Sequence, residues 1–133
     1  MSGPRDLIYM DLKEIIKEKL PLIKEIRKEL NENPELAFEE YKTQKIIQQA
    51  LDSFGISNYT CAKTGVVALL NEGEEAIAVR ADMDALPING VSHSCGHDYH
   101  MAIGLGTALV LKALGCEKTV KFIFQPAEEG TRG

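Results

Sequence analysis

The second half of the chain alternates a short apolar segment, a long helical segment and another apolar segment, and this order constrains the fold more than any other feature. Residues 76–81 predict a strand, about Asp98 to Leu114 a helix closed by Gly115, and residues 119–124 a strand buried on both faces. Such a succession forms a right-handed βαβ unit with parallel strands. Polar clusters follow both strands, and open α/β sheets bind ligands at the carboxyl ends of their strands.

The first part of the chain is predicted to be helical. Apolar residues recur at helical spacing over residues 11–30, where Pro21 is expected to end one helix or to begin a second. A second amphipathic segment over residues 39–54 ends at Gly55. Residues 1–10 show little pattern and are predicted to be a disordered leader, with one domain over residues 11–133.

Two more strands are expected between these helices and the βαβ unit. Residues 57–61 and 65–70 have strand character, and the polar, glycine-containing residues 71–75 predict a hairpin turn to the next strand. The fold class predicted from this order is α/β, with a mixed, largely parallel sheet and flanking helices.

Charge, hydropathy and cysteine content limit the partners and the cell compartment expected for this chain. The net charge is −5, from 15 Lys+Arg and 20 Asp+Glu that are interspersed, so that nucleic acid is not expected as a partner. The longest apolar stretch, residues 101–111, is far shorter than the ~20 residues that span a bilayer, and no membrane association is expected. Three widely spaced cysteines and the lack of a signal-peptide pattern predict a cytoplasmic protein.

The densest group of reactive side chains is His93-Ser94-Cys95-Gly96-His97-Asp98-Tyr99-His100, which holds all three histidines of the chain. A thiolate and an imidazole two residues apart suit zinc, and also manganese, cobalt or nickel. Two other interpretations remain open at this point. Cys95 is a buried small side chain beside polar helix-cap histidines, or Cys95 and His97 are a nucleophile and its base.

Carboxylates follow both strands of the βαβ unit. Asp82 and Asp84 lie two residues apart at the end of the first strand, so that one of them could orient a metal-bound imidazole. Glu128 and Glu129 follow the last strand, and adjacent acids can divide their roles, one binding a metal and the other taking a proton from water. Each pair alone would also suit a polar strand end or a solvated loop.

Taken together, these motifs resemble the zinc peptidase and aminoacylase family, in the branch of N-acyl-amino-acid amidohydrolases that includes hippurate hydrolases, auxin-conjugate hydrolases and N-acetyl-diaminopimelate deacetylases. Five stretches carry the resemblance, in order: RKELNENPELAFE (27–39), TGVVA (64–68), RADMDALPI (80–88), HSCGHDYH (93–100) and FQPAEEG (124–130). The resemblance implies the N-terminal part of a metallo-aminopeptidase-like catalytic domain.

The resemblance also implies roles for individual residues. Cys95, His97 and Glu129 are expected to bind a pair of divalent metal ions, with the sulfur between them. Glu128 is expected to be the base that takes the proton of a metal-activated water, and Asp84 to orient a ligand. Asp82, Asp98 and His100 are expected to contact and orient these residues without binding the metal themselves. The expected substrate is a small N-acyl amino acid or peptide, cut at its amide bond.

Three departures from the family pattern bear on activity. Asn31 stands where relatives commonly have a histidine, at a position interpreted as structural, and only four residues separate Ile88 from His93 where relatives carry a longer loop. Two further histidine ligands and a lid domain come from later sequence in the family. The 133 residues are therefore expected to be inactive or nearly so, with exposed sheet edges that favour self-association. A non-catalytic metal-binding or interaction module is the alternative.

Overall fold

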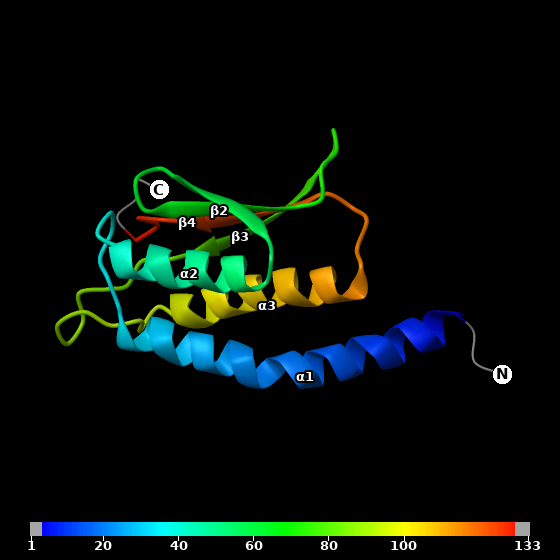
Figure 1. The fold of residues 1–133 in the computed structure, drawn as a ribbon. Helices are drawn as coiled ribbons and strands as arrows, with labels where there is room; N and C mark the ends of the chain where they lie inside the picture. The colour runs from blue at the N-terminus through cyan, green and yellow to red at the C-terminus, as the bar shows by residue number, and fades with distance from the viewer. Residues whose placement is uncertain (1–3, 130–133) are drawn as a thin grey trace.

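Two helices cover one face of a four-stranded sheet in the computed structural model, and a third helix packs against these two on the side away from the sheet, as Figure 1 shows. The structure describes residues 4–129, and the side chains of residues 12–129. The helices are α1 (Pro4–Glu32), α2 (Tyr41–Ser53) and α3 (His97–Leu114). A mixed α/β fold with a mixed sheet and flanking helices is thereby confirmed.

Helix α1 runs without interruption through Pro21, so the expected division into two helices is wrong. Proline removes one backbone donor and tends to bend a helix, but it does not end one whose apolar stripe continues on both sides. Ile26 and Leu30 continue that stripe into the core, at 8% and 0% exposure. The helix begins at Pro4 and so includes residues predicted as a leader; residues 1–3 lie outside the described residues, and the division into leader and domain stays a prediction.

Helix α2 matches its prediction closely. Ile46, Ile47, Ala50 and Leu51 form its buried face, as their spacing predicts. The helix stops where Gly55 adopts a φ of 72°, a left-handed conformation that costs glycine little. The predicted amphipathic helix is confirmed, with boundaries shifted inward by one or two residues.

The sheet consists of β1 (Ser57–Cys61), β2 (Gly65–Leu70), β3 (Ile77–Asp82) and β4 (Val120–Gln125), in the spatial order β1-β2-β4-β3. Strand β4 therefore lies between β2 and β3, and the predicted hairpin turn at residues 71–75 is wrong because β2 and β3 are not neighbours. The predicted parallel pairing across α3 is confirmed, since β3 and β4 are parallel. The other two pairings, β1 with β2 and β2 with β4, are antiparallel, so parallel pairing is less extensive than expected.

The core lies between the sheet and the helices. Val120, Phe122 and Phe124 of β4 face the helices and are 4%, 1% and 1% exposed. The intervening residues Lys121 and Ile123 are exposed and half-buried, so the expected burial of β4 on both faces is wrong for the described chain. The physical reason is that α1, α2 and α3 all lie on the same side of the sheet (Figure 1).

Helix α3 comes close to the sheet at a glycine. A Cβ atom at Gly104 would lie 3.2 Å from Cε1 of Phe124 and 3.4 Å from Cβ of Ala81. The absence of a side chain there lets α3 approach the parallel strand pair β3 and β4. This approach brings the N-terminus of α3 to the carboxyl ends of both strands, where the polar side chains lie.

Candidate metal centre

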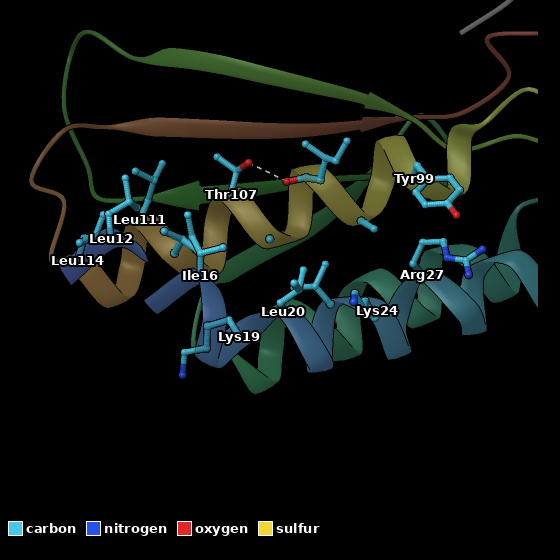
Figure 2. Close-up of a pocket in the computed structure, with 15 residues that line it drawn as sticks. Leu12, Ile16, Lys19, Leu20, Lys24, Arg27, Tyr99, Thr107, Leu111 and Leu114 are labelled. Carbon is cyan, nitrogen blue, oxygen red and sulfur yellow. Dashed lines mark hydrogen bonds between the residues drawn. The ribbon is translucent and has the colours of Figure 1, made fainter. Parts of the chain in front are cut away.

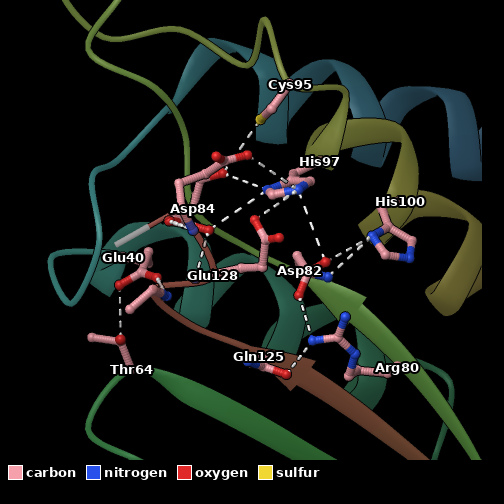
Figure 3. A network of polar contacts seen from close by, with 12 residues as sticks. Glu40, Thr64, Arg80, Asp82, Asp84, Cys95, His97, His100, Gln125 and Glu128 are labelled. Atoms are coloured by element: carbon pink, nitrogen blue, oxygen red, sulfur yellow. Dashed lines mark hydrogen bonds and ion pairs between the residues drawn. The ribbon is translucent and has the colours of Figure 1, made fainter. Parts of the chain in front are cut away.

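Residues from three elements meet at the carboxyl ends of β3 and β4, as Figure 3 shows. Asp82 ends β3 and Asp84 follows it, Glu128 follows β4, and His97 begins α3. The parallel register sets Asp82 opposite Gln125, so the two strands end at the same level. The sequence interpretation that these clusters form one site is consistent with this geometry.

His97 lies at the centre of the cluster, and its hydrogen bond fixes which ring nitrogen is free. Nδ1 lies 2.8 Å from the carbonyl oxygen of Asp84. Because a carbonyl oxygen can only accept, Nδ1 carries a proton, and in the neutral imidazole the free lone pair is on Nε2. A neutral imidazole oriented by a backbone carbonyl is a common form of metal-binding histidine.

Three carboxylates surround this free nitrogen. Nε2 of His97 lies 3.7 Å from Glu128 Oε2, 3.7 Å from Glu129 Oε1 and 3.9 Å from Asp82 Oδ2. Partial burial, with the charge of the neighbouring Glu128 carboxylate, raises the pKa of Glu129. Carboxylates gathered around one ring nitrogen repel each other unless a cation lies among them, so this arrangement fits a bound metal ion.

Cys95 lies beside the same cluster. Its Sγ is 3.5 Å from the carbonyl oxygen of Asp84, and the side chain is half-buried. Burial raises the pKa of this thiol above its ordinary value. A thiol in such surroundings is not an activated nucleophile, which argues against the nucleophile-and-base interpretation of Cys95 and His97.

Asp84 is fully buried and holds the segment after β4 in place. Its Oδ1 accepts a hydrogen bond from the backbone N–H of Glu128 at 3.1 Å, and Oδ2 accepts one from Glu129 at 2.9 Å. Its carbonyl oxygen contacts both His97 and Cys95. Asp84 thus contacts each of the residues proposed as ligands or base, which suits an orienting role.

Asp82 and His100 pair with each other at the edge of the cluster. The backbone N–H of Asp82 donates to Nδ1 of His100 at 3.2 Å, so that this nitrogen is already engaged. Oδ1 of Asp82 accepts a hydrogen bond from Arg80 at 3.0 Å, and Arg80 also contacts Gln125. These contacts fix the Asp82 carboxylate 3.9 Å from His97 Nε2.

Asp98 lies away from the free His97 nitrogen, on the side of α3 that faces α1. Its Oδ2 accepts hydrogen bonds from Asn31 Nδ2 at 3.0 Å and from Arg27 Nη1 at 3.2 Å. The guanidinium of Arg27 also stacks over the ring of Tyr99, 4.7 Å from its centroid. Asn31, a departure from the family pattern, therefore helps to attach α1 to the first turn of α3.

The described side chains form three groups that could each hold a metal ion, with ligand atoms within 4.8 Å of one another. All three groups contain His97, which has one free nitrogen, so they cannot be three separate sites. The donor set of sulfur, nitrogen and oxygen fits a borderline-soft divalent ion. The groups are Asp82 with His97 and His100, Cys95 with His97 and Glu129, and Asp84 with His97 and Glu128.

Two buried residues near the cluster were missed by the sequence interpretation or left without a role. Glu40, at the start of α2, is 0% exposed and accepts a hydrogen bond from the backbone N–H of Ala127 at 2.8 Å. His93 is 7% exposed and neither ring nitrogen has a hydrogen-bond partner among the described residues. Burial lowers the pKa of His93. No local sequence signal separates Glu40 from the exposed Glu39 beside it.

An apolar groove of about 780 Å³ lies elsewhere, between α1 and α3 (Figure 2). Ile16 and Leu20 line it from α1, and Ile103 from α3. Among the described residues that line it there is no acid, cysteine or histidine. The groove therefore offers no metal ligands and is separate from the polar cluster.

A thiol, an imidazole and paired carboxylates at the ends of parallel strands are the donor set expected of a metal-binding α/β protein. Residues 78–133 match the model of Peptidase family M20/M25/M40. These residues form part of a domain of this family, which is longer in its relatives. The resemblance inferred from the five sequence motifs is thereby confirmed.

The curated relatives include hydrolases and a deacetylase that are named for amino acid derivatives. The chain is 46% identical to IAA-amino acid hydrolase ILR1-like 6 of Arabidopsis thaliana, over 84% of this chain and 27% of that protein. It is 42% identical to N-acetylcysteine deacetylase of Bacillus subtilis, over 81% and 33%. Hippurate hydrolase of Campylobacter jejuni is 41% identical, over 81% and 32%. The chain thus spans about a third of the length of these relatives.

Solved structures agree with the fold. The YXEP protein of Bacillus subtilis, described as a dinuclear metal binding peptidase from the M20 family, superposes with a TM-score of 0.79 and 39% identity, over 88% of this chain and 38% of that one. A putative aminohydrolase from methicillin-resistant Staphylococcus aureus gives a TM-score of 0.77 and 31% identity, over 88% and 34%.

None of the helices in the described part of the chain is both long and apolar enough to cross a membrane.

Proposed function

We propose that this chain carries part of the active site of a divalent-metal-dependent amidohydrolase that acts on small N-acyl amino acids or short peptides. The observation that carries the proposal is the gathering of Glu128, Glu129 and Asp82 within 3.9 Å of the free nitrogen of His97. Because the chain spans about a third of its curated relatives, the activity of a whole protein belongs to the proposal.

The proposed ligands are Cys95, His97 and Glu129, whose donor atoms lie together. A bound divalent ion supplies a Lewis acid that polarises an amide carbonyl and makes water more acidic. Zinc, manganese, cobalt and nickel all accept such donors. Similarity to the dinuclear YXEP peptidase supports two ions, and the described residues share one histidine, so we propose that a two-ion site takes further ligands from outside the 133 residues.

The proposed base is Glu128. Its carboxylate is 39% exposed and lies 3.7 Å from His97 Nε2, so it can reach a water molecule beside the ligands. Asp84 fixes its backbone, and the orientation of His97 depends on the Asp84 carbonyl. Glu128 would hold the proton taken from water and return it to the leaving amine, which yields a carboxylic acid and a free amino acid.

Metal binding can be tested on the 133-residue chain by titration with each of the four metals and by metal content after gel filtration. We expect binding in the unmodified chain, and a loss of affinity of at least about tenfold in Cys95→Ala and His97→Ala. Cys116→Ala is the matched control, because Cys116 is also half-buried but lies at the far end of α3. Equal affinity in Cys95→Ala and Cys116→Ala would remove the sulfur from the ligand set.

Hydrolysis should be measured with a panel of N-acetyl and N-benzoyl amino acids, both on this chain and on a longer protein that contains it. We expect little or no turnover by the 133 residues alone, and turnover by the longer protein that Glu128→Gln reduces by about 10² to 10⁴-fold. Tight binding of one metal without hydrolysis in the longer protein would favour a non-catalytic metal-binding module.

Two further expectations accompany the proposal. Cys61, Cys95 and Cys116 are all free of disulfides, which supports a reducing compartment such as the cytoplasm. Strands β1 and β3 are the edges of the described sheet, and unpaired edges favour self-association of the isolated chain. A strictly monomeric species in gel filtration would contradict the second expectation.

A further inference from the structure

The segment that carries Glu128 and Glu129 is held through its backbone. The two side chains are 39% and 32% exposed, so packing does not fix them. Three consecutive N–H groups, of Ala127, Glu128 and Glu129, donate instead to carboxylate oxygens at 2.8, 3.1 and 2.9 Å. Asp84 supplies two of these acceptors and Glu40 the third.

Glu40 is an unusual source for such a contact. It stands at the start of α2, 87 residues before Ala127 in the sequence, and its side chain does not cap its own helix. Both carboxylate oxygens are used, since Oε2 accepts from the Ala127 N–H and Oε1 from the hydroxyl of Thr64 at 2.9 Å. Figure 3 shows Glu40 between Thr64 and the segment after β4.

Burying this carboxylate is costly, which argues against its being an incidental core residue. Glu40 is 0% exposed, and no cation pairs with it among the described residues. Desolvation raises its pKa, and the nearby charge of Asp84 adds to the effect. An unpaired buried charge is retained only where its hydrogen bonds compensate.

The conformation of Ala127 shows what the contact accomplishes. Ala127 has a φ of 57°, a left-handed conformation that alanine rarely adopts, and is fully buried. Successive N–H groups that include a left-handed residue can turn toward one side and form a concave anion-binding surface. Here two buried carboxylates, Asp84 and Glu40, occupy that surface.

We infer that Glu40 is a positioning residue, which holds Ala127 in its left-handed conformation and thereby directs Glu128 and Glu129 toward His97. The inference rests on the proposed function only for the roles given to those two glutamates. It connects the start of α2, outside every motif proposed to bind metal or substrate, to the geometry of the site.

The test is amide hydrogen exchange of the apo chain at Glu128 and Glu129, whose own acceptors on Asp84 remain in every variant. We expect Glu40→Ala to speed exchange at both amides by about tenfold, the change that follows the loss of one charge-assisted hydrogen bond. Ile47→Ala is the control, because Ile47 belongs to the buried face of the same helix and its side chain can make no hydrogen bond to the segment. Equal acceleration in Glu40→Ala and Ile47→Ala would overturn the inference.

Two conservative variants keep the test decisive if Glu40→Ala does not fold. Glu40→Gln retains an oxygen for Ala127 and an N–H₂ that the Thr64 hydroxyl can accept, so exchange should remain near that of the unmodified chain. Glu40→Asp keeps the charge but is too short to reach Ala127, and should speed exchange as alanine does. The reverse order would refute a role that depends on reach.

Metal titration of the same variants separates the two proposals. We expect Glu40→Ala and Glu40→Asp to bind metal about tenfold more weakly, because mutation of a residue that orients metal ligands commonly lowers metal affinity. We expect Glu40→Gln to bind metal nearly as well as the unmodified chain. If the unmodified chain binds no metal, the proposed function fails, while the exchange comparison still decides the role of Glu40. If metal affinity is unaltered although exchange accelerates, the positioning does not extend to the metal ligands.

Discussion

Asp98→Ala should cost the chain a large part of its stability. The carboxylate is 2% exposed and accepts from Arg27 and Asn31, so its removal leaves two donors of α1 without their partner. Removing one member of a buried pair costs about 3–5 kcal/mol. The Arg27 side chain is 29% exposed, so water can hydrogen-bond its guanidinium after the substitution, and the expected loss of stability is about 3 kcal/mol. Typical domains have about 5–15 kcal/mol in all.

Urea unfolding of single and double variants measures this loss and assigns it. In a double-mutant cycle, Arg27→Ala and Asp98→Ala should show a coupling energy of about 1–2 kcal/mol, and Asn31→Ala with Asp98→Ala about 1 kcal/mol. Asp52→Ala is the control, since the contact of Asp52 with Asn58 is exposed and its loss should stay within about 0.5 kcal/mol. A loss below about 1 kcal/mol for Asp98→Ala, or no coupling to either partner, would refute the reasoning.

Two more predictions concern pH and packing. Because burial raises the pKa of Glu40 in the folded state above its unfolded value, the folded chain holds this proton over a pH window where the unfolded chain has lost it. Stability therefore falls as pH rises from the ordinary glutamate value through the raised one, and Glu40→Gln should become progressively more stable relative to the unmodified chain across that window. Urea midpoints from about pH 4 to about pH 8 test this, and a constant difference would contradict it. Gly104→Ala should destabilise by about 1–3 kcal/mol, because its Cβ would lie 3.2 Å from Phe124. Gly106→Ala, whose Cβ would meet Ile23 at an ordinary 3.5 Å, should instead stabilise by about 0.5–1 kcal/mol, and thermal unfolding of both variants would show whether the signs are opposite.

Local patterns predicted the elements well. The buried face of α2 and the extents of β1 and β2 follow from periodicity within a few residues of sequence. Sheet order does not, because the place of β4 between β2 and β3 depends on contacts far apart in sequence, such as that of Val66 with Phe124, 58 residues later. The turn-like composition of residues 71–75 was therefore misleading.

The residues of the candidate site could be proposed from the sequence, but the hydrogen bonds that hold them in place could not. Asp84 and Glu128 were found because they follow strands, and His97 was found because it lies in the densest group of reactive side chains. The hydrogen bonds of Asp84 to two backbone N–H groups, and that of Glu40 to Ala127, join distant segments and leave no trace in composition. Local composition also did not predict that α1 continues through Pro21.

The placement of β4 also sets an order for folding. In the described sheet β4 is the sole link between the β1–β2 hairpin and β3, and it follows the other three described strands in the sequence. Until β4 is in place, the hairpin and β3 have no common partner among the described strands, although Asp82, Asp84, Cys95 and His97 precede it in the sequence. Closing the sheet requires long-range pairing, which makes such steps slow. The site and the described sheet therefore form together, when β4 inserts between β2 and β3.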